Sequence, residues 1–158
     1  MRSRAVTFAV TATTAVAVLG PSAAQASDAG LKKTVARHEK RVTPLAKAFA
    51  KADKALTTAT DTNAASAAAG AFRTGLRSFK TAIVPLKTES SAAAAGKKQM
   101  LTAIREFDLG LVQYQKLLEQ VAAGADKDAL KSTFNTLNKR LAAASDDEAS
   151  ALKLLKLK

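Results

Sequence analysis

Apolar side chains recur along the chain at alternating spacings of three and four residues, in four separate segments. This spacing places one apolar stripe on one side of an α-helix. The stripes begin at Leu31, Ala65, Met100 and Leu130, and the first of them includes the chain's single histidine, His38. The pattern predicts four amphipathic helices, at about 28–60, 62–88, 91–123 and 127–156.

The residues between the stripes are typical of helix ends. Asp61-Thr62-Asn63 and Ser90-Ser91 offer N-cap side chains, Gly124 suits the left-handed position after a helix, and Asp126 can cap the next one. Because the connections are short, consecutive helices are expected to be antiparallel neighbours. The expected fold is therefore all-α, an up-down-up-down antiparallel four-helix bundle.

Glycines and prolines are unusual inside helices, and Gly75, Gly110, Pro44 and Pro85 fall within the predicted ones. Gly75 and Gly110 each cost about 0.5–1 kcal/mol relative to alanine. Each marks either a close helix crossing or a tolerated weak point. The apolar stripe continues in phase beyond Pro44, so a kink is expected there rather than a helix end. Pro85 lies near the end of the second predicted helix.

The first 26 residues have the features of a secretory signal peptide. Arg2 and Arg4 precede an apolar stretch at 5–19, and Ala24-Gln25-Ala26 has the small-residue pattern of a cleavage site. The stretch is shorter than the roughly 20 residues that a spanning helix needs. We expect cleavage after Ala26, a mature domain at 27–158 and a secreted, extracellular product. A retained membrane anchor is the alternative interpretation.

Composition limits the kinds of chemistry that are open to the chain. It has no cysteine, so thiolate metal sites, a thiol nucleophile and disulfides are all excluded. The chain carries a net charge of +12, and the mature domain would keep +10. A soluble basic domain of about 130 residues, held together by its core alone, is therefore expected.

Basic residues gather on one line of the first predicted helix. With its apolar stripe facing inward, six of the seven outermost positions are cations, and the seventh is Pro44. We name these six residues the cationic ridge: Lys33, Arg37, Lys40, Lys47, Lys51 and Lys54. Like charges three and four residues apart destabilise a helix by about 0.2–0.5 kcal/mol per pair. A row of like charges that is unfavourable to its own helix suits an anionic partner, so the ridge is a candidate anion-binding surface. The alternative is a surface that only keeps the protein soluble.

The expected partner is an anionic cell-envelope polymer or an anionic lipid surface. Specific nucleic-acid binding is not expected, since the chain has one tyrosine, no tryptophan, and its phenylalanines after residue 26 fall in the apolar stripes. Two alternative functions stay open. One is a membrane-active amphipathic protein, and the other is a small-ligand carrier or an enzyme with a site in the bundle core.

No catalytic, cofactor or metal site is expected. His38 is the only histidine and lies on an apolar stripe, so a hydrogen-bonded histidine of the core or its boundary is a simpler interpretation than a metal ligand. Asp108 is the one acid placed well enough to consider for acid–base chemistry. Asp146-Asp147-Glu148 is too contiguous for a calcium loop.

Two further apolar features have more than one interpretation. Leu109 and Val112 fall on the outer side of the third predicted helix and are candidates for weak self-association. The alternative is that this helix is more buried than its stripe indicates. The tail from Ala151 to Lys158 alternates leucine and lysine loosely. It either extends the fourth helix, with Leu152 and Leu155 in the core, or forms a short cationic segment on a membrane surface.

Overall fold

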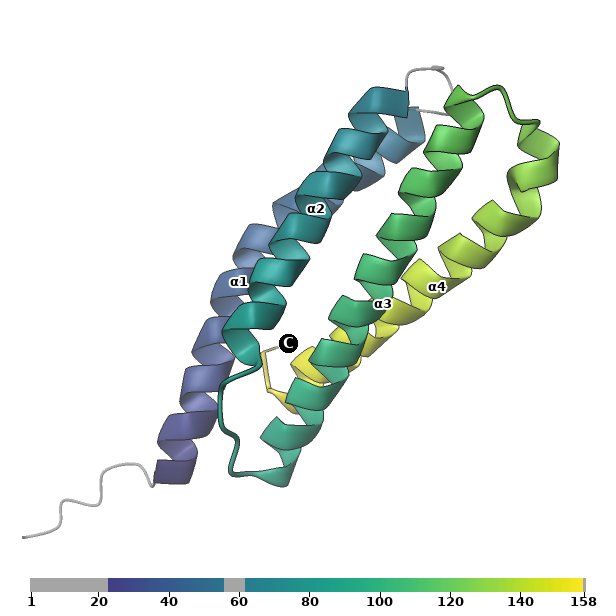
Figure 1. The fold of residues 1–158 in the computed structure, drawn as a ribbon. Helices are drawn as coiled ribbons and strands as arrows, with labels where there is room; N and C mark the ends of the chain where they lie inside the picture. The colour runs from purple at the N-terminus through teal and green to yellow at the C-terminus, as the bar shows by residue number, and fades with distance from the viewer. Residues whose placement is uncertain (1–22, 56–61, 158) are drawn as a thin grey trace, which may run out of the picture.

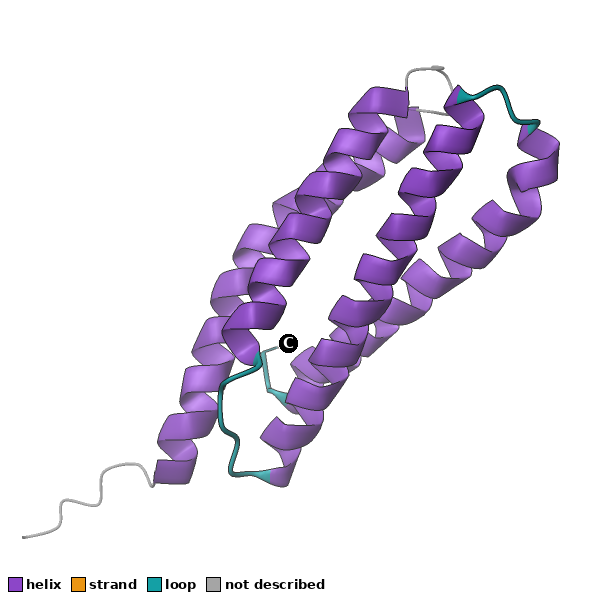
Figure 2. Ribbon diagram, viewed as in Figure 1, coloured by secondary structure: helices purple, strands orange, loops and turns teal. Residues whose placement is uncertain are grey.

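The computed structural model describes residues 23–55 and 62–157, and this part of the chain is helical with no β-strand (Figures 1 and 2). Most of the expected signal peptide lies outside the described residues, as do Leu56 and Asp61. The four helices are α1 (Ala23–Ala55), α2 (Thr62–Ile83), α3 (Ser91–Ala122) and α4 (Lys127–Leu154). The prediction of an all-α, four-helix protein is confirmed.

Consecutive helices lie side by side and run in alternating directions (Figure 1). α2 packs against α1 and α3, and α3 also packs along α4. Within the described residues, no Cα atom of α1 lies within 8 Å of a Cα atom of α4. The arrangement is consistent with a four-helix bundle, but one whose α1–α4 side is more open than the other three.

The apolar stripes form one continuous core, as the sequence predicts. Leu31, Val35 and Val42 of α1 are buried, together with Phe72, Leu76 and Phe79 of α2 and further apolar residues of α3 and α4. α3 is buried over a wider arc than its stripe predicts, since Ala103, Gly110 and Leu117, which lie beside the stripe, are also inside. The physical reason is that α3 has neighbours on two sides, α2 and α4.

Three helix ends show why the chain turns where it does. Ser90 accepts a 3.1 Å hydrogen bond from the Ala93 amide and so caps α3, as predicted. Gly124 follows α3 with a φ of 85°, and Lys156 follows α4 with a φ of 55°. In both places the next amide bonds back to a carbonyl of the preceding turn, which closes a Schellman motif.

The predicted end of the second helix is wrong by five residues, because α2 ends at Ile83 rather than at 88. Pro85 gives the reason, since its ring disfavours helical geometry at the preceding Val84. The backbone instead makes a turn in which the Leu86 amide bonds to the Ile83 carbonyl at 3.2 Å.

Both glycines that the sequence singled out lie at close helix crossings. A Cβ atom at Gly75 would stand 2.7 Å from Cδ1 of Leu45 on α1, and one at Gly110 would stand 2.7 Å from Cδ2 of Leu141 on α4. A third crossing, at Gly96, was not predicted; a Cβ there would lie 2.8 Å from Cγ of the buried Leu155. These positions lack a side chain because the facing helix occupies the space.

The C-terminal tail belongs to the core. Leu152 and Leu155 are fully buried, and Leu157 packs on the core cluster. The interpretation of the tail as an extension of the fourth helix is thus confirmed, and that of a separate membrane-surface segment is wrong for this structure.

Candidate functional site: the cationic ridge of α1

The six side chains of the cationic ridge are all exposed on α1, and Pro44, which lies in the same line, is exposed as well. α1 continues through Pro44 without a break in the helix. Residues three and four apart on a helix are neighbours on its surface, so the six charges form one row. From Lys33 to Lys54 the row is about 30 Å long at 1.5 Å per residue.

The rotation of α1 about its own axis is fixed at several points along its length. Leu31, Val35 and Val42 are buried on the inner side, and farther along the helix Asp53 accepts a 2.6 Å hydrogen bond from the Tyr114 hydroxyl of α3. Because Asp53 faces inward, the adjacent positions Lys51 and Lys54 are turned outward. The inner contacts therefore position the ridge.

The N-terminal end of α1 is tied to the connection between α2 and α3. The Ser27 hydroxyl donates a 2.5 Å hydrogen bond to the Lys87 carbonyl, and the Glu89 amide donates a 3.1 Å bond to Asp28 Oδ1. Hydrogen bonding, first from the Ser90 side chain and then from the Glu89 amide, lowers the pKa of Asp28 from its usual 3.8. These contacts act together with the core contacts to hold the whole length of α1.

Two acids of α1, Asp53 and Glu39, lie off the line of the ridge. Asp53 is bonded to Tyr114, and Glu39 lines the groove between α1 and α4. Arginines of α2 and α4 form ion pairs with two acids of α3, Asp108 and Glu106. Among the side chains that the structure describes, no ion pair involves the following five ridge residues: Lys33, Arg37, Lys40, Lys47 and Lys51.

His38 lies immediately beneath the ridge and is 8% exposed. Its ring stacks on Phe79 of α2, with a centroid separation of 5.2 Å and an interplanar angle of 5°. Burial lowers the pKa of His38 below 6.5, and the positive charges of Arg41 and Arg37 lower it further. The predicted core position is confirmed, and the ring contact that the structure shows is this stacking rather than a hydrogen bond.

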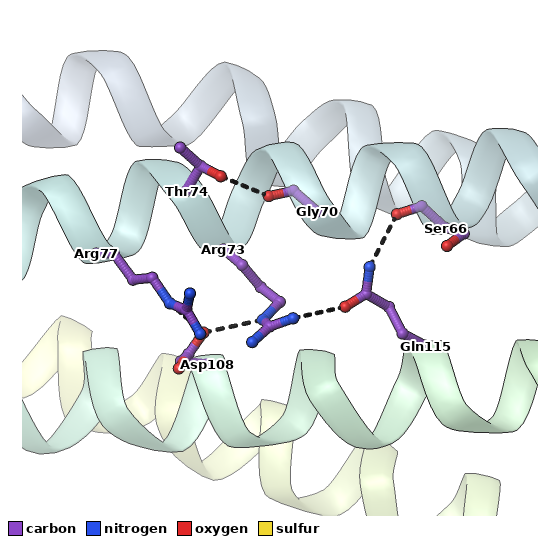
Figure 3. A network of polar contacts seen from close by, with 7 residues as sticks. All are labelled: Ser66, Gly70, Arg73, Thr74, Arg77, Asp108 and Gln115. Atoms are coloured by element: carbon purple, nitrogen blue, oxygen red, sulfur yellow. Dashed lines mark hydrogen bonds and ion pairs between the residues drawn. The ribbon is translucent and has the colours of Figure 1, made fainter.

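Asp108, the acid considered for acid–base chemistry, is engaged in a polar network between α2 and α3 (Figure 3). Its Oδ1 lies 3.0 Å from Arg73 Nε and 3.4 Å from Arg77 Nε. Arg73 also donates a 2.7 Å hydrogen bond to Gln115, whose amide donates to the Ser66 carbonyl. Two guanidinium groups hold this carboxylate, so its role in the structure is to join two helices.

A groove of about 400 Å³ lies between α1 and α4, where the bundle is open. Phe72, Leu76 and Phe107 line it together with Glu39 and Glu148. A carrier or enzyme site in the bundle core would lie here, because the groove reaches the buried Phe72 and Leu76. It opens to the surface beside the ridge residue Lys47.

Three other possibilities raised by the sequence concern an apolar contact surface, a metal site and a membrane-spanning helix. Leu109 is 40% exposed, whereas Val112 is half-buried, so only the first offers a sizeable apolar surface. In the part of the chain that the structure describes, no three histidine or acidic side chains gather as metal ligands would. No described helix combines the length and the apolar character that crossing a membrane requires.

No protein-family model matches the chain, and no curated protein or solved structure shows significant similarity to it.

Proposed function

We propose that the protein is a secreted, non-enzymatic binding module that docks through the cationic ridge on an anionic polymer of the cell envelope. The observation that supports this most strongly is the exposure of all six ridge side chains on one helix whose inner side is fixed in the core. A row of cations about 30 Å long at helical spacing matches an extended polyanion better than a compact ligand.

The proposed mechanism is charge pairing on a rigid rod. Bringing six like charges together on one helix face destabilises it, and an anionic polymer laid along the row would remove that repulsion. Binding would release counterions from the polymer, so affinity would fall steeply as salt rises. The binding surface would be preorganised, because α1 is held in place by Tyr114, by the core and by the 84–90 connection.

An affinity pull-down from cell-envelope fractions tests this proposal. The intact protein should retain anionic envelope polymer at low salt and release it at high salt. A variant in which the six ridge cations are changed to glutamine should retain little at either salt concentration. Equal retention by the two proteins would overturn the proposal.

A second candidate function is supported by the open α1–α4 side of the bundle. If α1 separated from its neighbours, its apolar face could lie on anionic lipid and the protein would be membrane-active. Leakage of a trapped dye from anionic vesicles distinguishes the two functions. A docking module should bind such vesicles without releasing the dye, whereas a membrane-active protein should release it.

A further inference from the structure

A second basic surface lies far from α1 in the chain, between the last turns of α2 and the first half of α3. It is a groove of about 470 Å³. Basic, threonine and apolar side chains line it: Lys80, Val84, Thr88, Ala94, Lys97, Lys98, Leu101, Thr102 and Arg105. The residues come from two helices and the connection after α2, so no single stretch of sequence reveals the groove.

The charge in this groove is unbalanced. Outside the groove, along the same pair of helices, the Asp108 carboxylate forms ion pairs with both Arg73 and Arg77. No carboxylate lines the groove, and within the described residues Lys80 and Arg105 have no ion-pair partner. The same holds for Lys98. Three exposed cations therefore surround a space that contains no counter-charge from this part of the protein.

One further cation fixes the shape of the groove. Lys97 Nζ donates hydrogen bonds to the carbonyls of Val84, at 2.8 Å, and Leu86, at 2.5 Å. These carbonyl groups lie in the connection just after α2, close to its C-terminal end, where a positive charge is also favoured by the helix dipole. Lys97 thus holds the connection after α2 against α3, and its charge adds to the positive potential of the groove.

The groove is also partly apolar. Val84 is 50% exposed, and among the described residues it is the most exposed of the large apolar side chains. Leu101 and Ala94 lie across from it on α3. On α3, Leu101 and Arg105 follow Lys98 at intervals of three and seven residues, so they share one face of the helix. Cationic and apolar groups therefore face the same space.

We propose that this groove binds a single-chain amphiphile with a phosphate headgroup. The phosphate lies against Lys80, Lys98 and Arg105, because a guanidinium and two ammonium groups match its oxygens and its charge. The acyl or alkyl chain lies over Val84 and Leu101, which removes their apolar surface from water. This site is separate from the cationic ridge, and the proposal does not depend on the ridge function.

Titration of the full-length protein with decyl phosphate, kept below its micelle concentration, tests the proposal by calorimetry. We expect saturable binding of one molecule per chain. Inorganic phosphate and decyl maltoside should each bind at least about tenfold more weakly, because each lacks one half of the interaction. If inorganic phosphate binds as well as decyl phosphate, the site takes free phosphate and the amphiphile proposal is wrong.

A matched pair of double variants separates the groove from general charge. Lys98→Gln with Arg105→Gln should weaken decyl phosphate binding by about tenfold or more. Lys116→Gln with Lys139→Gln removes the same charge from outside both the groove and the ridge and should leave binding unchanged. All four side chains are exposed, so both variants are expected to fold, which circular dichroism verifies. Equal losses in the two variants would overturn the proposal.

The apolar half of the site has its own test. Val84→Ser should weaken decyl phosphate binding several-fold and leave any inorganic phosphate binding unaltered. Unchanged decyl phosphate binding in this variant would contradict the placement of the chain over Val84. The ridge variant described under the proposed function should bind decyl phosphate normally, so failure of one proposal is distinguishable from failure of the other.

Discussion

The hydroxyl group of Tyr114 on α3 donates a 2.6 Å hydrogen bond to Oδ1 of Asp53 on α1. Tyr114 is 2% exposed, and its ring also meets Phe49 edge-on at a centroid distance of 4.9 Å. The bond is a direct polar link between the C-terminal part of α1 and the core of the bundle. It turns Asp53 inward and so leaves the neighbouring lysines of the ridge to face solvent.

Replacing Tyr114 with phenylalanine should lower the free energy of unfolding by about 1.5 kcal/mol, since a hydrogen bond to a charged acceptor is lost. Burial, and then the bond to Asp53 and its negative charge, raise the pKa of Tyr114 well above 10. The native state therefore keeps the phenolic proton more tightly than the unfolded state does. This contribution to stability is complete below pH 10 and is lost as the pH rises beyond it.

Urea denaturation between pH 8 and pH 11 measures both effects. The difference in unfolding free energy between the wild type and Tyr114→Phe should shrink above about pH 10. A variant as stable as the wild type at pH 8 would show that the bond does not hold α1.

The glycine positions offer a matched pair of stability predictions. Gly96→Ala places a Cβ within 3 Å of the fully buried Leu155, so the variant should lose about 1 kcal/mol or more of stability through overpacking. Gly30 is exposed on α1, and a Cβ added there would meet no atom within 4 Å. Gly30→Ala should therefore gain about 0.5–1 kcal/mol from helix propensity. Thermal denaturation of the two variants should shift in opposite directions, and a shared direction would contradict the packing at Gly96.

His38 reports on the ridge, because the ridge residue Arg37 and its neighbour Arg41 both lower its pKa. As the only histidine, it gives a single set of ring signals in a proton NMR titration. We expect a midpoint below 6.5 in the free protein. A polyanion bound along the ridge should raise the pKa of His38 by offsetting those positive charges, and Arg37→Gln should raise it without a polyanion.

The same depressed pKa makes the fold sensitive to mild acid. Below pH 6.5 the unfolded chain binds a proton at His38 more readily than the native state does, so stability falls as the pH falls through this range. In His38→Phe, which can keep the stacking on Phe79, this part of the pH dependence should be absent. A midpoint at or above 6.5 in the NMR titration would show that the ring is not buried beneath the ridge.

The expected export of the protein predicts a defined mature N-terminus. Mass spectrometry of the secreted protein should find Ser27 as its first residue, because cleavage is expected after Ala26. The contacts of Ser27 and Asp28 with the 84–90 connection would remain in that product. A secreted protein that begins at another residue, or a chain that stays in the cell, would contradict the interpretation of residues 1–26.

The sequence predicts the inner face of each helix well, since burial imposes a local period of three and four residues. His38, Tyr114 and Leu152 all lie inside, as their positions in the stripes predict. The relations between helices are harder to predict, because they depend on how distant segments align. The bond between Tyr114 and Asp53 and the partners of Asp108 are of this kind.

The two basic surfaces illustrate the same distinction. The cationic ridge lies on one helix, so a heptad count finds it directly. The groove brings Lys80 of α2 next to Lys98 and Arg105 of α3, and nothing in the sequence fixes that alignment before the helices are packed. The sequence does contain the cations, but it does not show that they share a space without a carboxylate.

If the ridge is the binding surface, the position of its charges, and not the overall charge of +12, should determine the affinity for anionic polymers. A matched control is available, because six exposed lysines lie outside both the ridge and the groove. They are Lys87, Lys116, Lys131, Lys139, Lys153 and Lys156. Changing either set of six to glutamine gives two proteins of equal net charge.

The most direct measurement is the affinity of these two proteins and the wild type for long-chain polyphosphate, as a function of salt concentration. The ridge variant should lose most of the affinity and most of the salt dependence, because it no longer displaces counterions along the polymer. The control variant should stay within a few-fold of the wild type in affinity. Equal losses in the two variants would contradict the account, since binding would then depend on total charge alone.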